Sequence, residues 1–487
     1  MSTVRRIAKN TTVLLTAQGI SLLLLLFYAM YAARYLGPAN YGIINFAIAF
    51  TGIFSILVDF GLQQITVRDV SKNKALALKY ITNVSLLKLI LAIVTYGLIA
   101  LTVNLLGYPL ETIQIVYLIG LSVVFSAISQ LMFAITQAYE RMELQAIGQI
   151  ISALISVCGV IVAVKYQWSL VQFATLYAIS SFGVLIYSLA IIRWGLKYEK
   201  AQEEPYRPRL DWQMWKDVIK NAWPIGILAA IGVLYFRIDV LMLQAMKGDS
   251  AVGLYSAARG LMELTFIIPG MLMVSVFPLM CQYYASAHTS LNVAYQKSIK
   301  YLFAVALPMA LLVTLLADHI IVLIYGDKFF GAADALRILI WAAVLVYINS
   351  VIGSMYIATN RQRTNLILVM IALVSNVLLN LALIPRLSYI GASATRIFNE
   401  ALGLVIGLYI FHRIGYKLNM RNVFLPPVLA FAVAAAVSLL LIKLGVNIYI
   451  VSVAVLLIYA ALVYILGIKE DDKQLIKSLF AKHTTSA

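Results

Sequence analysis

Stretches of about 20 predominantly apolar residues recur along the whole chain, and this feature restricts the fold more than any other. A helix that spans a bilayer needs about 20 such residues, because it rises about 1.5 Å per residue through roughly 30 Å of hydrocarbon. The windows lie at about 12–33, 41–62, 81–106, 113–136, 146–165, 170–192, 222–246, 252–283, 299–325, 332–359, 365–385, 390–411, 423–443 and 448–467. The sequence therefore predicts an all-α integral membrane protein with about 14 transmembrane helices.

The composition agrees, because 63% of the residues are hydrophobic and only 12% are charged. Soluble chains are roughly 45–50% apolar and about 25% charged. Cys158 and Cys281 lie far apart, and the four histidines have no ligand spacing, so no disulfide framework, metal site or other cofactor is expected. We find no phosphate-binding loop, dinucleotide fingerprint or hydrolase motif, and so no catalytic residue is predicted. Nothing here indicates ATP hydrolysis or acyl transfer, so we expect that the protein is not an enzyme.

The net charge of +17 is better explained by membrane topology than by nucleic acid. An even number of spans places both termini on one side. The apolar run after Arg5, Arg6 and Lys9 is too long for the core of a cleavable signal, so we interpret it as the first span. With the N-terminus inside, 26 of the 37 Lys and Arg residues fall in inner loops. The six in outer loops are Arg34, Lys165, Lys247, Lys328, Arg386 and Lys443. We expect a multi-pass plasma (inner) membrane protein with both termini in the cytoplasm.

An internal repeat with an offset of 211 residues indicates the domain organisation. Lys9-Asn10 recurs as Lys220-Asn221, Gly37 recurs as Gly248, and Gly42 recurs as Gly253. Repeats of six spans are parallel, as in transporters built from two halves. We therefore predict two pseudo-symmetric six-helix lobes and two C-terminal helices. The segments are an N-lobe at 1–192, a cytoplasmic linker at 193–221, a C-lobe at 222–413, and spans 13 and 14 with a cytoplasmic tail at 414–487.

The linker leaves two interpretations open. Two glutamates and two prolines at 203–208 mark it as a connection between lobes. Trp212, Trp215 and Ile219 then follow at i, i+3 and i+7. That spacing favours an amphipathic helix in the headgroup region, but a helical extension of span seven has the same pattern.

Nine charged residues lie inside the predicted spans. They are Asp59, Lys88, Arg237, Asp239, Arg259, Glu263, Arg337, Arg396 and Glu400. An ionised group at the bilayer centre costs roughly 2.5–3.5 kcal/mol on insertion scales, so these side chains should face protein or a wet cavity.

Two of the arginines have a glutamate one helical turn later. Arg259 and Glu263, and likewise Arg396 and Glu400, are four residues apart and can meet on one face of a helix. These two pairs are predicted either to be purely structural or to take part in transport.

The remaining cations are better candidates for binding an anion. We expect Lys88, Arg237 and Arg337 not to be neutralised within their own helices. For Lys88 and Arg337, snorkelling toward a nearby interface is the alternative. A cavity between the lobes with excess Lys and Arg would attract an anion such as a diphosphate, which Arg can grip through two parallel N–H donors.

The predicted cationic cavity is thus lined by Lys88, Arg237, Arg259, Arg337 and Arg396. Four carboxylates, Asp59, Asp239, Glu263 and Glu400, are predicted to form ion pairs or to bind a coupling proton or Na⁺. Prolines inside spans eight and nine permit kinks. Pro269-Gly270 is predicted as a bend, acting either as a hinge or as a static kink.

Several short motifs, in this order and spacing, resemble the polysaccharide transporter branch of the multidrug/oligosaccharidyl-lipid/polysaccharide (MOP) exporter superfamily. They are RYLGPANYG at 34–42, DFGL at 59–62, RID at 237–239, GLYSAA at 253–258 and IYGDKF at 324–329. The resemblance covers essentially the whole chain. It implies a Wzx-type flippase with 12–14 helices in two lobes.

The resemblance also implies the substrate. Wzx-type flippases move an undecaprenyl-diphosphate-linked oligosaccharide from the inner to the outer leaflet by alternating access, for a surface glycan such as O-antigen or capsule. The implied partners are that lipid-linked oligosaccharide, membrane lipid and a coupling ion, with no nucleic acid.

Three other functions stay open on the sequence. A cation-coupled multidrug exporter of the same superfamily often carries an acid in span one, but 12–33 contains none. A lipid II flippase has a similar lobe plan. A membrane glycosyltransferase or polymerase would usually need a sizeable external loop, and the predicted outer loops are short.

Overall fold

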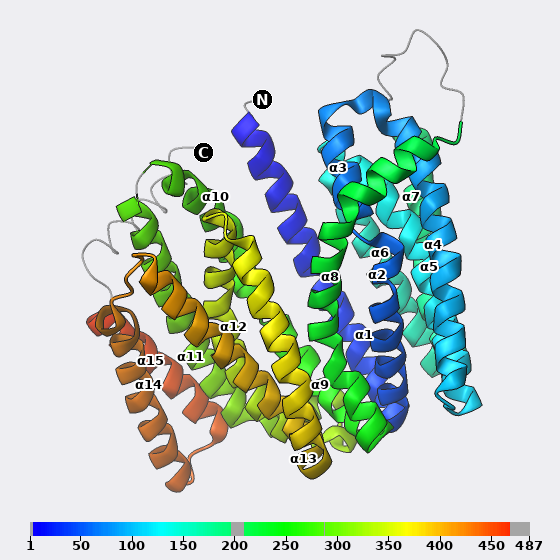
Figure 1. The fold of residues 1–487 in the computed structure, drawn as a ribbon. Coiled ribbons are helices and arrows are strands. Elements are labelled where there is room, and N and C mark those ends of the chain that lie inside the picture. Colours follow the sequence, from blue (N-terminus) through cyan, green and yellow to red (C-terminus); the bar gives the residue numbers. More distant parts are fainter. Residues whose placement is uncertain (1–2, 196–208, 287, 468–487) are drawn as a thin grey trace. The chain divides into compact units, whose positions relative to one another are not determined.

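The computed structural model describes residues 3–195, 209–286 and 288–467 (Figure 1). Within these ranges the chain is helical throughout and contains no strand, which confirms the all-α prediction. The elements are α1 (Thr3–Phe54), α2 (Ile56–Asp59), α3 (Leu62–Lys72), η1 (Lys74–Leu76), α4 (Ala77–Leu105), α5 (Leu110–Ala138), α6 (Met142–Lys165), α7 (Leu170–Ala190), η2 (Ile191–Gly195), α8 (Trp212–Lys247), α9 (Asp249–Leu264), α10 (Ile267–Ser286), α11 (His288–Tyr325), η3 (Asp327–Phe329), α12 (Ala332–Ala358), α13 (Gln362–Arg413), α14 (Met420–Lys443) and α15 (Ile448–Gly467).

Twelve helical stretches in the described part of the chain are long and apolar enough to cross a membrane. Two helices, α1 and α13, have 52 residues each; α13 contains two predicted spans, and α1 contains the first predicted span and most of the second. Each consists of two helices joined at one non-helical residue, Gly37 (φ 71°, ψ 173°) in α1 and Ser388 (φ 52°, ψ −133°) in α13. The structure therefore agrees with a multi-pass membrane protein, while 14 as the number of crossings stays a prediction.

The chain forms two compact units. Unit 1 comprises 1–257, 324–331 and 369–392, and unit 2 comprises 258–323, 332–368 and 393–487. The division of the sequence into lobes at 1–192 and 222–413 stays a prediction based on the repeat.

Unit 1 is built around α1, α4, α5, α6 and α7, with α5 packed against α7 and α4, and α1 against α6. A core of buried apolar side chains joins α3, α4 and α5 to the first turns of α8. From α8 it takes Met214, Trp215 and Val218. The start of α8 is therefore part of the helical bundle.

The structure shows how the linker joins span seven. Helix α8 has 36 residues from Trp212 to Lys247 and contains Pro224, so the amphipathic segment is continuous with span seven, and its place in the headgroup region stays a prediction. Asp211 caps it, because its carboxylate accepts a hydrogen bond from the Met214 N–H at 2.9 Å. Trp215 is buried in the core and Trp212 is 67% exposed. The acidic, proline-containing part at 203–208 lies outside the described residues.

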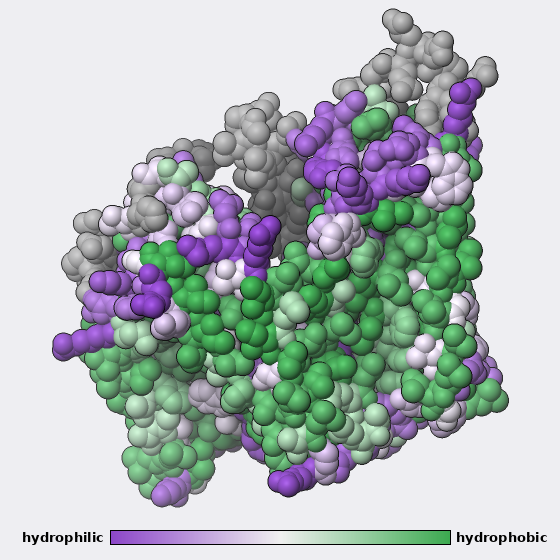
Figure 2. Space-filling view, viewed as in Figure 1, coloured by the Kyte–Doolittle hydropathy of each residue, from purple (hydrophilic) through white to green (hydrophobic). Residues whose placement is uncertain are grey.

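Hydrophilic side chains gather at the end of unit 1 that carries α3 (Figure 2). Arg68 pairs with Asp69 there, and Lys79 of α4 pairs with Asp211 before α8 at 2.7 Å. The segments 68–79 and 209–220 thus meet at one end of unit 1, and the side of the membrane on which they lie stays a prediction. Between the ends, the helices in this view are covered by hydrophobic side chains, as expected for surfaces that face lipid.

The repeat is visible in the backbone. Gly37 and Gly248 both adopt a conformation closed to most other residues, with φ 71° and ψ 173° in the first copy and φ 77° and ψ −172° in the second. The next helical break also recurs, because α2 begins at Ile56 and α10 begins at Ile267, again 211 residues apart. The two copies therefore share local geometry as well as a few identical residues.

The helices that follow these two glycines cross in close contact inside unit 1. A Cβ on Gly42 would lie 1.9 Å from the carbonyl oxygen of Asp249. A Cβ on Gly253 would lie 1.9 Å from the carbonyl oxygen of Pro38. Each copy places its glycine on the backbone of the other, and the two contacts are related by the same offset of 211 residues. Only glycine permits this approach.

Unit 2 contains the rest of α9, followed by α10, α11, α12 and the C-terminal pair. Helix α10 packs against α12, and α14 lies beside α15 (Figure 1). Tyr459 of α15 donates a hydrogen bond to the carbonyl oxygen of Ala304 in α11 at 2.9 Å. This contact fixes the C-terminal pair to α11.

Candidate functional site

The most deeply buried of the predicted charges is Lys88 in α4. Its Nζ lies 2.7 Å from Asp59 Oδ1 of α2, and the side chain of Lys88 is 0% exposed, whereas that of Asp59 is 26% exposed. The expectation that Lys88 escapes neutralisation within its own helix is met. An acid from another helix nevertheless pairs with it, and its role toward an anion stays a prediction. Complete burial also excludes snorkelling for Lys88.

An unusual turn places Asp59 next to this lysine. Phe60 is left-handed (φ 37°) and Gly61 follows with φ 85°, so α2 ends and α3 begins within two residues. A Cβ on Gly61 would lie 2.6 Å from the carbonyl oxygen of Ala222 in α8. A Cβ on Gly226 would be equally close to the Phe60 ring. The turn is therefore packed directly against α8, and this contact holds a left-handed phenylalanine that would otherwise be unfavourable.

A cavity of about 370 Å³ lies beside Asp59 within unit 1. It is lined by α2, α5 and α8 and the turn after α2, through Ser55, Ile56, Val58, Asp59, Phe60, Ser122, Val123, Ser126, Ala127, Gln130, Ala229 and Val233. Lys88 does not line it. The hydroxyl and amide residues of α5 carried no signal in the sequence, because a serine or glutamine inside an apolar helix is common.

The two predicted pairs within single helices are confirmed. In α9, Arg259 Nε lies 2.7 Å from Glu263 Oε1. In α13, Arg396 Nη2 lies 3.0 Å from Glu400 Oε1. The two pairs differ in burial, since the side chain of Glu263 is 42% exposed and that of Glu400 only 10%.

Asn349 of α12 completes the second pair and was missed in the sequence. Its Nδ2 lies 2.9 Å from both Oε2 and the carbonyl oxygen of Glu400. The amide therefore supports the carboxylate that Arg396 neutralises. A lone asparagine in an apolar window offered no way to predict this partner.

The prediction that Arg337 has no acidic partner within its own helix is wrong. Arg337 Nη1 lies 2.8 Å from Asp334, three residues earlier in α12. Its Nη2 contacts Asp318 of α11. Two carboxylates thus hold this arginine, and its role toward a substrate stays a prediction.

Arg237 and Asp239 follow the expectation that residues two positions apart point in different directions. Asp239 is buried (1% exposed) and accepts a hydrogen bond from Tyr255 Oη at 2.8 Å. Arg237 is directed elsewhere, with its Nε 3.9 Å from the place of a Cβ on Gly52. Tyr255 belongs to the GLYSAA motif, so a motif residue proves to be the partner of an intramembrane acid.

The chain bends close to the predicted Pro269-Gly270 position. The break falls at Thr265–Phe266, between α9 and α10, so Pro269 lies in the first turn of α10, where a missing N–H costs little. The Thr265 carbonyl oxygen accepts a hydrogen bond from Tyr347 Oη of α12 at 2.7 Å. The bend is thus a built feature of unit 2, and its movement as a hinge stays a prediction.

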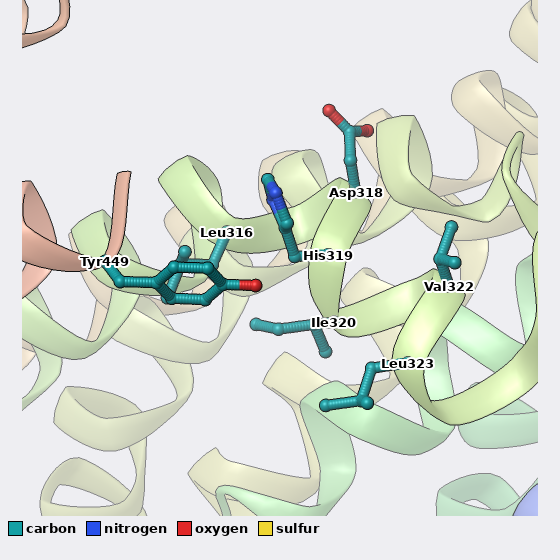
Figure 3. A pocket seen from close by; sticks show the side chains of 7 residues that line it. All are labelled: Leu316, Asp318, His319, Ile320, Val322, Leu323 and Tyr449. Atoms are coloured by element: carbon teal, nitrogen blue, oxygen red, sulfur yellow. The ribbon is translucent and has the colours of Figure 1, made fainter. Parts of the chain in front are cut away.

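A second cavity, of about 530 Å³, lies between α11 and the start of α15 in unit 2. Figure 3 shows its residues, Leu316, Asp318, His319, Ile320, Val322, Leu323 and Tyr449. The Tyr449 hydroxyl points among the aliphatic side chains, whereas the Asp318 carboxylate points away from the ring. A cavity this apolar is a poor site for a diphosphate.

No metal centre is evident in the described ranges, where no group of three or more His, Cys, Asp or Glu side chains is placed to hold an ion. Cys158 and Cys281 are both free thiols.

Comparison with known protein families gives two matches. Residues 7–284 match the model described as a polysaccharide biosynthesis protein, and residues 224–382 match the MatE model. The chain is also 23% identical over 413 residues to the capsular polysaccharide biosynthesis protein CapF of Staphylococcus aureus. That similarity covers 83% of this chain and 99% of CapF.

Two solved structures share the fold. The lipid II flippase MurJ, in an inward closed conformation, matches with a TM-score of 0.74 and 16% identity over 92% of this chain and 97% of its own. A MATE family multidrug resistance transporter of the MOP superfamily, in an inward-facing conformation, matches with a TM-score of 0.63 and 16% identity over 81% of this chain and 94% of its own. At these identities the likeness shows the fold, which is that of an all-α membrane transporter.

Proposed function

This chain belongs to the polysaccharide biosynthesis protein family, in the polysaccharide transporter branch of the MOP exporter superfamily, and we propose that it flips an undecaprenyl-diphosphate-linked oligosaccharide across the plasma membrane. The observation that carries the proposal is the family match over residues 7–284. Similarity along nearly the whole length of a capsular polysaccharide biosynthesis protein supports a surface glycan as the cargo.

The proposed orientation has both termini in the cytoplasm. It rests on the positive-inside rule, because 26 of the 37 Lys and Arg residues fall in loops on that side. The basic loops that meet at one end of unit 1 support it. In this orientation Asp59, at the end of the second predicted span, lies toward the cytoplasmic side.

We further propose that the intramembrane arginines attract the diphosphate while the prenyl tail stays in lipid and the glycan crosses in water. Arg237 and Arg259 are the first candidates, since a guanidinium can donate two parallel hydrogen bonds to a phosphate. Lys88 is fully buried against Asp59, so its part is to hold that carboxylate. Arg337 and Arg396 would first have to share or release their carboxylates.

Transport requires no covalent chemistry, so the proposed cycle consists only of binding and alternating access. The bend at Thr265–Phe266 is the proposed place of movement. The intramembrane carboxylates are the proposed sites of coupling to a proton or Na⁺.

The test is a vesicle assay with purified protein. A fluorescent undecaprenyl-diphosphate oligosaccharide is incorporated into both leaflets, and an impermeant reductant is added outside. Without a flippase only the outer leaflet loses fluorescence, whereas an active flippase exposes nearly all of the probe. Recovery of chemically unchanged lipid excludes a glycosyltransferase or polymerase. Protection of the inner leaflet at every protein density would overturn the proposal.

A charge reversal links the assay to the candidate site. Arg237→Glu is expected to abolish translocation without lowering expression, because it replaces a cation by an anion where the diphosphate is proposed to bind. Lys216→Glu, an exposed charge reversal near the start of α8, is the matched control and should transport normally. Normal transport by Arg237→Glu would remove that residue from the site.

The MatE match over 224–382 and the shared fold favour a second candidate, a cation-coupled multidrug exporter. The same vesicles can be loaded with a cationic dye under a proton or Na⁺ gradient. Gradient-driven dye movement without lipid translocation would favour the exporter. Labelled lipid II as a parallel substrate separates a lipid II flippase from a surface-glycan flippase.

A further inference from the structure

The cavity beside Asp59 has lining chemistry that a purely cationic diphosphate site does not explain. Its polar groups form two stripes with a spacing of four residues. Ser122, Ser126 and Gln130 lie on one face of α5, and Ser55 and Asp59 lie opposite them. Two helical faces thus present hydroxyl, amide and carboxylate groups to one space of about 370 Å³.

The ion pair makes this space neutral. Asp59 Oδ1 accepts from Lys88 Nζ at 2.7 Å and from the Gln63 N–H at 3.3 Å. Its Oδ2 has no hydrogen-bond partner among the described residues. Lys88 is buried away from the cavity and cancels the charge of Asp59. The cavity therefore offers a strong hydrogen-bond acceptor without a net charge, which suits neither a free anion nor a free cation.

The α5 stripe adds donors and acceptors. Gln130 is exposed to this space, and its amide has no partner among the described residues, so it can both donate and accept. The Ser122 hydroxyl donates to the Ile119 carbonyl at 2.6 Å, and its oxygen keeps acceptor capacity toward the cavity. Aliphatic side chains such as Val123 and Val233 cover the walls between these groups.

We propose that this cavity is the subsite for a neutral sugar residue of the lipid-linked glycan, a hexose or an N-acetylhexosamine. The inference rests on the proposed flippase function and deepens it. A sugar ring carries hydroxyls around its edge and C–H groups on its faces, which matches polar stripes separated by aliphatic walls. The volume lies in the range of ordinary small-ligand sites.

The same chemistry gives a specificity. Asp59 is the only charged residue among those that line the cavity, and no lining Lys or Arg is present to balance a second carboxylate. A uronic acid would bring an anion into a neutral space whose one nearby cation, Lys88, is already paired with Asp59, and burying a charge without a partner is costly. The subsite should therefore accept neutral sugars and reject acidic ones at this position. Lys88 is a positioning residue, because it orients Asp59 without lining the cavity.

The experiment measures binding to the full-length protein in lipid nanodiscs. The probes are farnesyl diphosphate, the same lipid carrying one neutral sugar (glucose, galactose, N-acetylglucosamine or N-acetylgalactosamine), and the same lipid carrying glucuronic acid. For the wild type, at least one neutral sugar is expected to raise the affinity above that of farnesyl diphosphate. Glucuronic acid is expected to give no increase.

Two variants test the lining. Ala229→Phe adds a ring at an exposed lining position and should lower the affinity for the sugar-bearing probe to that of farnesyl diphosphate. Gln130→Ala should lower it about 2- to 10-fold, the ordinary effect of one neutral hydrogen bond. Both should bind farnesyl diphosphate as the wild type does. The matched controls are Gln64→Ala in α3 and Ala432→Phe in α14, which are exposed and do not line the cavity.

The possible outcomes distinguish failure of the sugar-subsite proposal from failure of the flippase proposal. If the wild type translocates lipid in vesicles but no neutral sugar raises its affinity, the subsite is wrong and the flippase stands. The subsite is equally wrong if Ala229→Phe and Gln130→Ala keep the full sugar-dependent increase. If neither farnesyl diphosphate nor any sugar-bearing probe binds and no lipid is translocated, both proposals fail together.

Discussion

The two copies of the repeat break their helices at matching positions and place different chemistry there. In the first copy, α2 begins at Ile56 and carries Asp59, which pairs with a lysine from another helix beside a polar cavity. In the second copy, α10 begins at Ile267 and carries Pro269 in its first turn. The charges there, Arg259 and Glu263, precede the break and neutralise each other on one helix.

This difference shows which features the repeat preserves. Glycines with restricted conformations and the position of the break recur because the backbone needs them. The side chains at the break are not repeated, so the first copy has a cross-helix pair that can define a binding surface. The second has a self-contained pair and a proline that define a bend. The same duplicated backbone can thus carry a binding surface in one copy and a bend in the other.

The largest expected effect comes from the crossing at which each copy places a glycine against the backbone of the other. Gly42→Ala and Gly253→Ala each drive a Cβ to 1.9 Å from a backbone carbonyl oxygen of the opposite copy. Neither carbonyl can move like a side chain, so each variant should lose more than about 5 kcal/mol, enough to remove most of the folded protein. Fluorescence-detected size exclusion and thermal unfolding measure this.

Gly232→Ala in α8 is the control for that pair, because nothing lies within 4 Å of its Cβ. It should be neutral or slightly stabilising, since alanine favours a helix over glycine. If Gly42→Ala or Gly253→Ala unfolds no more easily than this control, the crossing of the two copies is not as close as described.

The second largest expected effect is a difference in stability between variants of two ion pairs, Lys88–Asp59 and Arg259–Glu263. Asp59→Asn leaves a fully buried lysine without its carboxylate and should cost about 3 kcal/mol. Glu263→Gln removes a carboxylate that is 42% exposed, so about 1 kcal/mol or less is expected. Denaturant or thermal unfolding of both variants in one detergent compares them directly.

A double variant shows whether the stability lost in Asp59→Asn comes from the buried unpaired lysine or from the lost contact itself. Asp59→Asn combined with Lys88→Met removes the buried charge and should recover most of the lost stability. Equal costs for Asp59→Asn and Glu263→Gln would contradict the contrast drawn between the two copies.

The third expected effect is a loss of stability at the Thr265–Phe266 bend of the second copy. Tyr347→Phe removes the hydroxyl that donates to the Thr265 carbonyl oxygen, and about 1 kcal/mol should be lost. The same oxygen also accepts a hydrogen bond from the Ile268 N–H at 3.1 Å, so it keeps one partner in the variant. Pro269→Ala is the control, because residue 269 lies in the first turn of α10, where a missing N–H costs little, and it should change the stability less than Tyr347→Phe does. Equal losses of stability for the two variants in unfolding measurements would contradict this expectation.

Much of this contrast was predictable, and the limits have physical causes. The apolar windows predict helices because the bilayer fixes their length. The pairs Arg259–Glu263 and Arg396–Glu400 were predictable because helical geometry alone brings residues four apart together. Lys88 with Asp59 was not, because that contact depends on how α4 packs against α2.

Arg337 and the polar cavity illustrate the same limit. Asp318 reaches Arg337 from α11, and Asn349 reaches Glu400 from α12, so both partners are far away in the sequence. The serines and Gln130 of α5 become informative only when α2 and α8 are placed around them. Periodicity predicts which face of a helix a residue occupies, but not which helix covers that face.

The smallest effect on stability is expected for a second ion pair of α4, which is more exposed than the Lys88–Asp59 pair. Its lysine, Lys79, lies nine residues before Lys88. Lys79 lies 2.7 Å from Asp211, with side chains 38% and 32% exposed. The hydrogen bond from Lys79 and the backbone N–H of Met214 hold the pKa of Asp211 below its ordinary value. Asp211→Asn keeps a capping side chain and removes only the charge, so the melting temperature should fall by about 1–2 °C at neutral pH.

The pH dependence follows from the direction of that shift. A carboxylate with a lowered pKa stabilises the fold at every pH above its unfolded pKa, about 3.9, and that contribution is lost as the pH falls through the folded value. The difference in melting temperature between wild type and Asp211→Asn should stay constant from pH 8 to about pH 5 and shrink below about pH 4. Added salt should also reduce it, because both groups are exposed. A difference as large as that of Asp59→Asn, or one that survives high salt, would mean that burial is not what separates the two pairs on α4.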